Sequence, residues 1–122
     1  EARPPAEALA YTEENWRSVA ERHPGKPVVV TEAGWTTRSG GRGVRAEHAS
    51  PANQATYLAA LDAWSRARGI LTFVFEAFDE AWKGAPDPLE PEKHWGVFTA
   101  DRRPKPAIQP LFPDLPPAGT QP

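Results

Sequence analysis

Two short apolar runs that lack alternating polar residues most constrain how this chain of 122 residues can fold. The first run, Val28-Val29-Val30-Thr31, lies in an expected strand over residues 26–31, and the second predicts a strand over residues 70–75. A strand with one face in water alternates apolar and polar residues, whereas a strand covered on both faces of a parallel sheet stays apolar throughout. Both runs therefore predict parallel strands that are buried on both faces.

A segment with helical character precedes each run. Residues 6–22 carry a ragged apolar stripe, and Pro24-Gly25 is expected to end that helix. A second helix is expected to begin at Ser50-Pro51, with Ser as the N-cap and Pro in the first turn, and to end at Gly69. The apolar residues on one face of this second helix are Tyr57, Leu58, Leu61 and Trp64.

The order helix, strand, helix, strand predicts an α/β fold with parallel pairing. Two buried strands do not form a stable sheet by themselves, and a complete (β/α)8 TIM barrel takes about 250 residues. We therefore expect the chain to supply two parallel strands with flanking helices to such a barrel, as roughly half of its length. The first residue is not Met and no signal peptide is visible, which likewise indicates a segment of a longer chain.

Composition excludes several classes of partner and cofactor. The formal net charge of -2 gives no reason to expect a nucleic acid. No apolar run approaches the ~20 residues of a membrane span. The chain has no Cys, and His23, His48 and His94 are scattered, so we expect neither a metal site nor a cofactor.

Acidic residues and tryptophans follow both predicted strands, where α/β barrels place their chemistry. Glu32 ends the first strand within Val30-Thr31-Glu32-Ala33-Gly34-Trp35, and a second acidic cluster occupies residues 75–83. Glycoside hydrolysis needs a pair of carboxyl groups, and sugar rings pack on indole faces, so this combination favours a carbohydrate-active site. A solvated turn residue would explain Glu32 equally, a structural ion pair would explain Glu76, and packing would explain the tryptophans.

Three ordered motifs resemble glycoside hydrolase family 17, the β-1,3-glucanases. Residues 28–35 resemble the family's nucleophile motif, residues 73–83 its last-strand motif, and residues 92–98 its Glu-x-x-aromatic-Gly-aliphatic-Phe segment. The resemblance covers roughly residues 6–108, so it implies that residues 1–108 are the C-terminal portion of a catalytic barrel.

The remaining residues 109–122 are expected to form a proline-rich tail. Residues 104–122 hold seven of the 15 prolines, which predicts a tail or linker that does not pack.

The resemblance implies roles for individual residues. Glu32 resembles the catalytic nucleophile, and Glu80, Lys83 and Glu92 resemble the polar groups that line the cleft. A cationic Lys83 near Glu32 would favour the ionised nucleophile. The family usually has Pro where Thr36 stands, which leaves the path of the following loop open.

The family's general acid/base, a Glu in an Asn-Glu pair at the end of the fourth strand, has no counterpart in the chain. The resemblance therefore implies that the chain alone does not catalyse. With two strands and open edges, we also expect it to be poorly stable as a monomer and to associate with copies of itself or with a missing N-terminal half of the barrel.

Several functions remain compatible with these motifs. A retaining β-1,3-glucan hydrolase and a β-1,3-glucan transglycosylase share the nucleophile motif. A non-catalytic glucan-binding half barrel would use Trp35, Trp82 and Trp95 as platforms for sugar rings. An unrelated α/β structural domain would carry the acidic loops by coincidence. The resemblance is compatible with an extracellular, periplasmic or membrane-anchored location, which the residues themselves do not specify.

Overall fold

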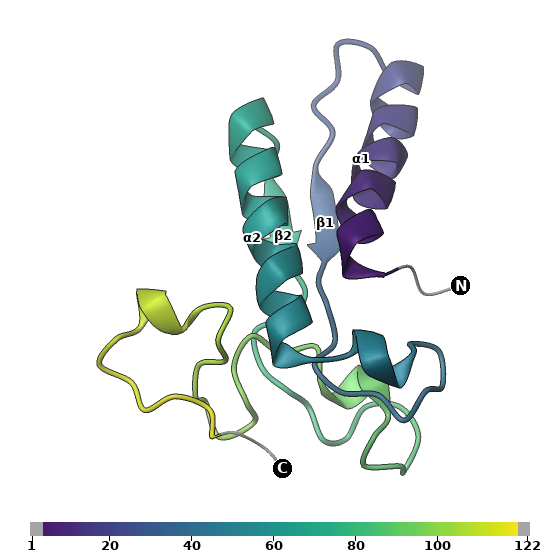
Figure 1. The fold of residues 1–122 in the computed structure, drawn as a ribbon. Coiled ribbons are helices and arrows are strands. Elements are labelled where there is room, and N and C mark those ends of the chain that lie inside the picture. The colour runs from purple at the N-terminus through teal and green to yellow at the C-terminus, as the bar shows by residue number, and fades with distance from the viewer. Residues whose placement is uncertain (1–3, 120–122) are drawn as a thin grey trace.

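The computed structural model describes residues 4–119, which form a helical layer over a pair of strands, with long loops at one end (Figure 1). The α-helices are α1 (Pro5–Arg22) and α2 (Pro51–Arg68), and the strands are β1 (Val30–Ala33) and β2 (Thr72–Val74). Three short 3-10 helices lie in the loops, at Ala46–His48, Pro91–Lys93 and Gln109–Leu111. The strands pair in parallel, with Val30 opposite Thr72 and Ala33 opposite Val74. The predicted α/β organisation with parallel pairing is confirmed.

Local signals at both ends of α2 explain its bounds. The Ser50 hydroxyl accepts a hydrogen bond from the Asn53 backbone N–H at 3.0 Å, and Pro51 occupies the first turn. At the other end Gly69 adopts the left-handed conformation, with φ of 64°, that ends many helices. The helix predicted from Ser50 to Gly69 is therefore confirmed.

The apolar core lies between the two helices and the strand pair. Trp64 packs edge-to-face against Trp16 of α1, with ring centroids 6.1 Å apart. Leu61 is 1% exposed, which makes it the most completely buried apolar residue of this core. The buried hydrophobic residues are Ala8, Ala33, Tyr57, Leu58, Leu61, Trp64 and Ile70. The face of α2 predicted from its apolar spacing is thus the face that packs.

The strands are not buried on both faces, so that prediction is wrong for the chain as described. Leu71 is 59% exposed and Phe73 is 54% exposed, whereas Ile70 is buried and Thr72 is half-buried. The helices cover one face of the strand pair and leave the other open, and at Val74, which is 47% exposed, the alternation ends. β1 and β2 are also shorter than the predicted strands, and Glu32 lies within β1.

Residues beyond β2 form a small ladder below the strand ends. Phe78 bridges Phe98 in parallel, and Phe98 bridges Pro104 in the antiparallel direction. Pro104 and Lys105 are buried, and Ala118 donates its backbone N–H to the Pro104 carbonyl at 2.9 Å. The predicted unpacked tail over 104–122 is therefore wrong at its start, because proline excludes helix and sheet interiors without excluding burial. A boundary after residue 108 stays a prediction.

Candidate active site

The carboxyl ends of β1 and β2 meet at the loop end of the fold, and two glycines bring the backbone segments there into close approach. Phe75 donates its backbone N–H to the Ala33 carbonyl at 2.8 Å. A Cβ at Gly34 would lie 1.7 Å from the Phe75 carbonyl oxygen, so only glycine fits. Further along, a Cβ at Gly96 would lie 2.2 Å from the backbone nitrogen of Asp79.

Glu32 is exposed at this end and lines a cavity of about 700 Å³. The same cavity is lined by a second exposed carboxylate, Glu92, and by the rings of Phe75 and Trp95. Its wall extends to Tyr11 of α1. Two carboxylates and aromatic rings around an open cavity suit the binding of a polyhydroxylated ligand.

Lys83 binds two carboxylates, and neither of them is Glu32. Its Nζ lies 2.5 Å from Glu76 Oε2 and 2.5 Å from Glu80 Oε2. Nζ also lies over the Phe75 ring, 4.8 Å from its centroid. Among residues 4–119 no ion pair joins Lys83 to Glu32, so the expected contact with Glu32 is absent and the ammonium instead holds Glu76 and Glu80. Glu76 thus has the structural ion pair that the sequence left open.

The pKa values within this cluster shift in opposite directions. Burial raises the pKa of Glu76, and the hydrogen bond from Lys83 only partly offsets it. The hydrogen bond from Lys83 lowers the pKa of Glu80, whose side chain is half-buried. The two carboxylates in turn raise the pKa of Lys83, Glu76 most strongly. Lys83 therefore stays cationic, and Glu76 accepts a proton more readily than Glu80.

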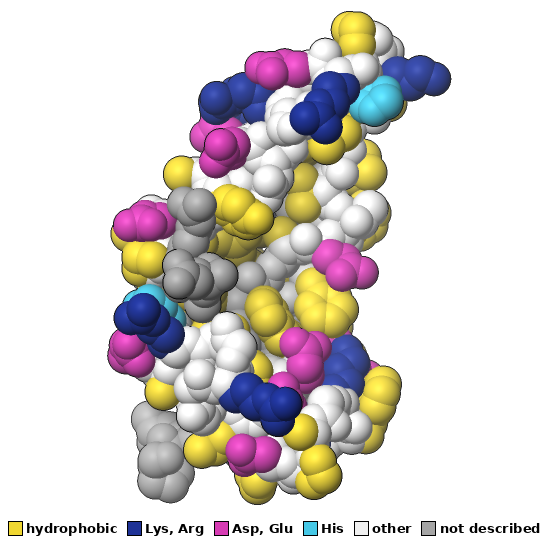
Figure 2. All heavy atoms as spheres, turned by 90° about the vertical axis from the view of Figure 1, so that its right-hand side faces the viewer, with side chains coloured by type: hydrophobic (Ala, Val, Ile, Leu, Met, Phe, Trp, Pro, Cys, Tyr) yellow, Lys and Arg dark blue, Asp and Glu magenta, His cyan; other side chains and the backbone are white. Residues whose placement is uncertain are grey.

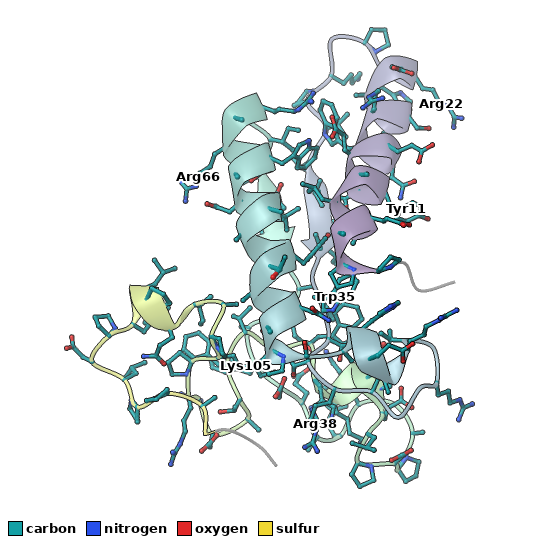
Figure 3. All side chains as sticks on the ribbon, viewed as in Figure 1. Tyr11, Arg22, Trp35, Arg38, Arg66 and Lys105 are labelled. Carbon is teal, nitrogen blue, oxygen red and sulfur yellow. The ribbon has the colours of Figure 1, made fainter. Side chains whose placement is uncertain are left out.

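The three candidate tryptophans differ in their surroundings. Trp35 packs on Tyr57, with ring centroids 5.4 Å apart, and donates its indole N–H to the His48 carbonyl at 2.8 Å. Figure 3 shows Trp35 near the N-terminal ends of α1 and α2. Its contacts with Tyr57 and His48 make it a packing residue. Trp95 lines the Glu32 cavity, and Trp82 is 76% exposed near Lys83. Of these three tryptophans, only Trp95 lines the cavity that contains Glu32.

Exposed apolar and charged side chains lie together on one face of the molecule. Figure 2 shows hydrophobic side chains at mid-height on this face, next to a group of acidic and basic side chains. Such a surface offers both stacking and hydrogen bonding to a ligand.

Thr36 takes up the position where the resemblance implies proline, and it anchors the following loop. It is 1% exposed, and its hydroxyl oxygen lies 3.0 Å from the carbonyl oxygens of both Arg38 and Pro91. The loop after β1 is therefore tied to the segment that carries Glu92.

Three polar residues near the site had no role assigned from sequence. Gln54 of α2 is fully buried, and its Nε2 lies 2.9 Å from the Trp35 carbonyl and 3.0 Å from the Gly96 carbonyl. Buried Lys105 forms an ion pair at 2.7 Å with Asp79, whose side chain is 15% exposed. Asp79 lies within the motif over residues 73–83, which was an available signal, whereas the proline-rich surroundings of Lys105 gave none.

An α/β chain with carboxylates and aromatic rings gathered at its strand ends has the features of a glycoside hydrolase. The chain belongs to the BtgE/BtgC glycoside hydrolase domain family, whose model matches residues 1–96. Its resemblance to glycoside hydrolase family 17 is thereby confirmed.

Individual relatives agree with this assignment. A glucan 1,3-beta-glucosidase of Arthroderma benhamiae is 40% identical over 86 residues, which are 64% of this chain and 26% of the relative. The family 17 beta-1,3-glucanosyltransferase of Rhizomucor miehei is 29% identical, with a TM-score of 0.74 over 87% of this chain and 37% of that one. An active-site mutant of the Rhizomucor enzyme, solved in complex with laminaritriose, gives a TM-score of 0.75 at 28% identity over the same shares of the two chains. The chain thus spans about a quarter of the curated relative and little more than a third of the solved structures.

Two further observations concern only residues 4–119. No helix in this range is long and apolar enough to cross a membrane. No group of three or more His, Asp or Glu residues in the same range is arranged to hold a metal ion.

Proposed function

We propose that this chain is the nucleophile-bearing, C-terminal part of a TIM-barrel enzyme that hydrolyses β-1,3-glucan with retention of configuration. The observation that carries the proposal is the exposure of Glu32 at the end of a parallel strand, in a cavity shared with Glu92 and Trp95. Membership of a glycoside hydrolase family and likeness to a glucanosyltransferase solved with laminaritriose support the substrate class.

In the proposed reaction the Glu32 carboxylate attacks the anomeric carbon of the glucan. The glycosidic carbon–oxygen bond breaks as an acid gives its proton to the leaving oxygen, and a covalent glycosyl ester forms on Glu32. Water, deprotonated by the same acid/base, then attacks the anomeric carbon and releases Glu32. We place the acid/base in a part of the barrel outside these 122 residues, because Glu76 and Glu80 are both held by Lys83.

The remaining candidates support this reaction in the proposal. Lys83 holds Glu80 and lies over the ring of Phe75, a residue of the cavity wall, and Glu92 offers a carboxylate to sugar hydroxyls from the same wall. Trp95 is the best-placed platform for a sugar ring, because it lines the cavity, and the exposed Trp82 could serve a more distant ring. Trp35 supports the site through packing on Tyr57.

The experiment replaces Glu32 by Gln in the whole protein and measures laminarin hydrolysis and laminaritriose binding. Turnover should fall by about 1,000-fold or more while affinity changes little, because the lost group acts in the covalent step. Glu14→Gln on the exposed surface of α1 is the matched control. A mechanism-based fluoroglycoside should label Glu32, and labelling of Glu80 would overturn the assignment.

Transfer to a sugar is the second candidate, favoured by the likeness to the Rhizomucor glucanosyltransferase. An acceptor hydroxyl would then replace water in the second step. Chromatography of the products from laminaritriose separates the two, because transfer yields longer oligosaccharides and hydrolysis yields shorter ones. Binding of laminaritriose by the whole protein without either product would instead indicate a non-catalytic glucan-binding half barrel. The 122-residue chain alone should give no product.

A further inference from the structure

Lys105 is a buried cation outside the catalytic candidates. Its side chain is 5% exposed, and burial lowers its pKa against the opposing effect of Asp79. Figure 3 shows Lys105 among the loops at the N-terminal end of α2. Lysine is almost never fully buried unless a charged partner offsets the cost of removing its ammonium from water. The contacts of the ammonium therefore indicate the role of Lys105.

The Lys105 ammonium joins three loop segments. Its Nζ donates to Asp79 Oδ1 at 2.7 Å and to Thr37 Oγ1 at 2.9 Å, and it lies 3.4 Å from the His94 carbonyl. Asp79 directly precedes Glu80, and His94 directly precedes Trp95. A single cation therefore holds the segment after β1, the segment that bears Lys83 and the segment that bears Trp95.

Asp79 extends this connection to the cavity wall. Its Oδ1 also accepts the Gly96 backbone N–H at 3.0 Å, and its side chain is 15% exposed. Its backbone N–H donates to the Phe98 carbonyl at 2.9 Å, and Lys105 donates its own to the Val97 carbonyl at 2.9 Å. Asp79 and Lys105 thus both hydrogen-bond to residues 96–98, Asp79 through its side chain and backbone and Lys105 through its backbone.

We propose that Lys105 is a positioning residue for the β-glucan reaction, which it serves by fixing the loops that carry Glu80, Lys83 and Trp95. The proposal rests on the proposed function of the Glu32 cavity. Lys105 lies beyond residues 1–96, which the family model matches, so the site depends on a segment outside that match. Loss of the ammonium leaves the Asp79 carboxylate buried without its cation, and the loops must move to hydrate it.

The test compares Lys105→Met with Lys26→Met in the whole protein, at a temperature well below both unfolding midpoints. Lys26 is exposed at the opposite end of α1 from the site and serves as the matched control. Lys105→Met should lower kcat/KM on laminarin by about 10- to 100-fold, with a raised KM, because small displacements of substrate-positioning groups are costly. Adding Asp79→Asn should restore part of the loss, because it removes the uncompensated carboxylate.

Amide NMR supplies a readout that is independent of activity. In Lys105→Met the Gly96 amide and the Trp95 indole signals should both shift, whereas Lys26→Met leaves them in place. If Lys105→Met fails to fold, Asp79→Asn alone should shift the Gly96 amide and lower kcat/KM less severely. Kinetics and spectra of a folded Lys105→Met that equal those of Lys26→Met would overturn the proposal. A wild-type protein without activity on laminarin would instead defeat the proposed function, while the spectra still test the positioning.

Discussion

The half of the molecule built from helices and strands is held together differently from the loop half. In the first half apolar side chains fill the space between α1, α2 and the strands, with Leu61 at 1% exposure. In the loop half buried polar groups make the connections, with Gln54, Thr36 and Lys105 each reaching carbonyls or a carboxylate of separate segments. Leu61 and Gln54 lie on the same helix, so α2 serves both halves. Apolar packing tolerates small shifts, whereas hydrogen bonds specify positions, and the proposed site needs both.

The largest expected effect on stability tests the apolar half. In the 122-residue chain, Leu61→Ala should lower the free energy of unfolding by about 2–5 kcal/mol, because it opens a cavity in the core. Leu71→Ala, on the open face of the strand pair at 59% exposure, is the comparison: it should cost little in a monomer, and more where a copy of the chain covers this face. Urea unfolding measures both. A large cost for Leu71→Ala would mean that another chain or copy covers this face in solution.

A smaller effect tests the polar half. Gln54→Met keeps the size of the side chain but leaves the carbonyls of Trp35 and Gly96 without their donor, at a cost of about 1–3 kcal/mol. Thr56→Val, on the exposed side of α2, is the control. Unfolding curves give the stability, and tryptophan fluorescence reports on Trp35 and Trp95. Equal stabilities of the two variants would show that the loops do not depend on Gln54.

The smallest effect concerns the protonation of the Lys83 cluster. As the pH falls towards the ordinary carboxyl value of 4.5, Glu76 should take up its proton before Glu80, because their pKa values are raised and lowered respectively. Glu76 then stabilises the fold at low pH and loses this contribution as the pH rises through its folded pKa. Glu80 stabilises the fold at pH values above its ordinary pKa. This stabilisation is lost as the pH falls through the lowered pKa that Glu80 has in the folded state.

Carboxyl-detected NMR titration follows both groups separately. Lys83→Met should raise the pH at which each carboxylate takes up its proton, since the ammonium favours the ionised form of both. If Glu76 and Glu80 titrate in the same order and with the same midpoints in the wild type and in Lys83→Met, the ion pairs of Lys83 with both carboxylates are contradicted.

Sequence patterns predicted the parts of the fold that depend on local physics. The N-cap at Ser50, the left-handed Gly69 and the apolar face of α2 are all short-range signals, and the structure confirms them. The parallel pairing followed from the apolar runs before Glu32 and Glu76. The exposed face of β2 could not be predicted from the same runs, because they indicate what a strand can bury and not which neighbour is present.

The loop contacts lay beyond sequence reasoning because they join segments far apart in the chain. Lys83 was expected beside Glu32, yet two carboxylates much closer to it in sequence, Glu76 and Glu80, hold it. Lys105 was hidden by proline content that predicted a linker. A buried lysine has no sequence pattern of its own, so only the fold reveals it. The catalytic assignments of Glu32 and the supporting residues stay predictions until the variants are measured.

The two crowded glycines limit how this site can change. At both glycines another backbone segment approaches closely. A Cβ at Gly34 would lie 1.7 Å from the Phe75 carbonyl oxygen, and a Cβ at Gly96 would lie 2.2 Å from the Asp79 backbone nitrogen. Residues 40–49 and 84–90 lie between the two glycines along the chain, and insertions there lengthen loops without adding a Cβ at either glycine. Any side chain at Gly34 or Gly96 would therefore force the neighbouring backbone segment to move away. Changes to the loops around this site should therefore keep both glycines.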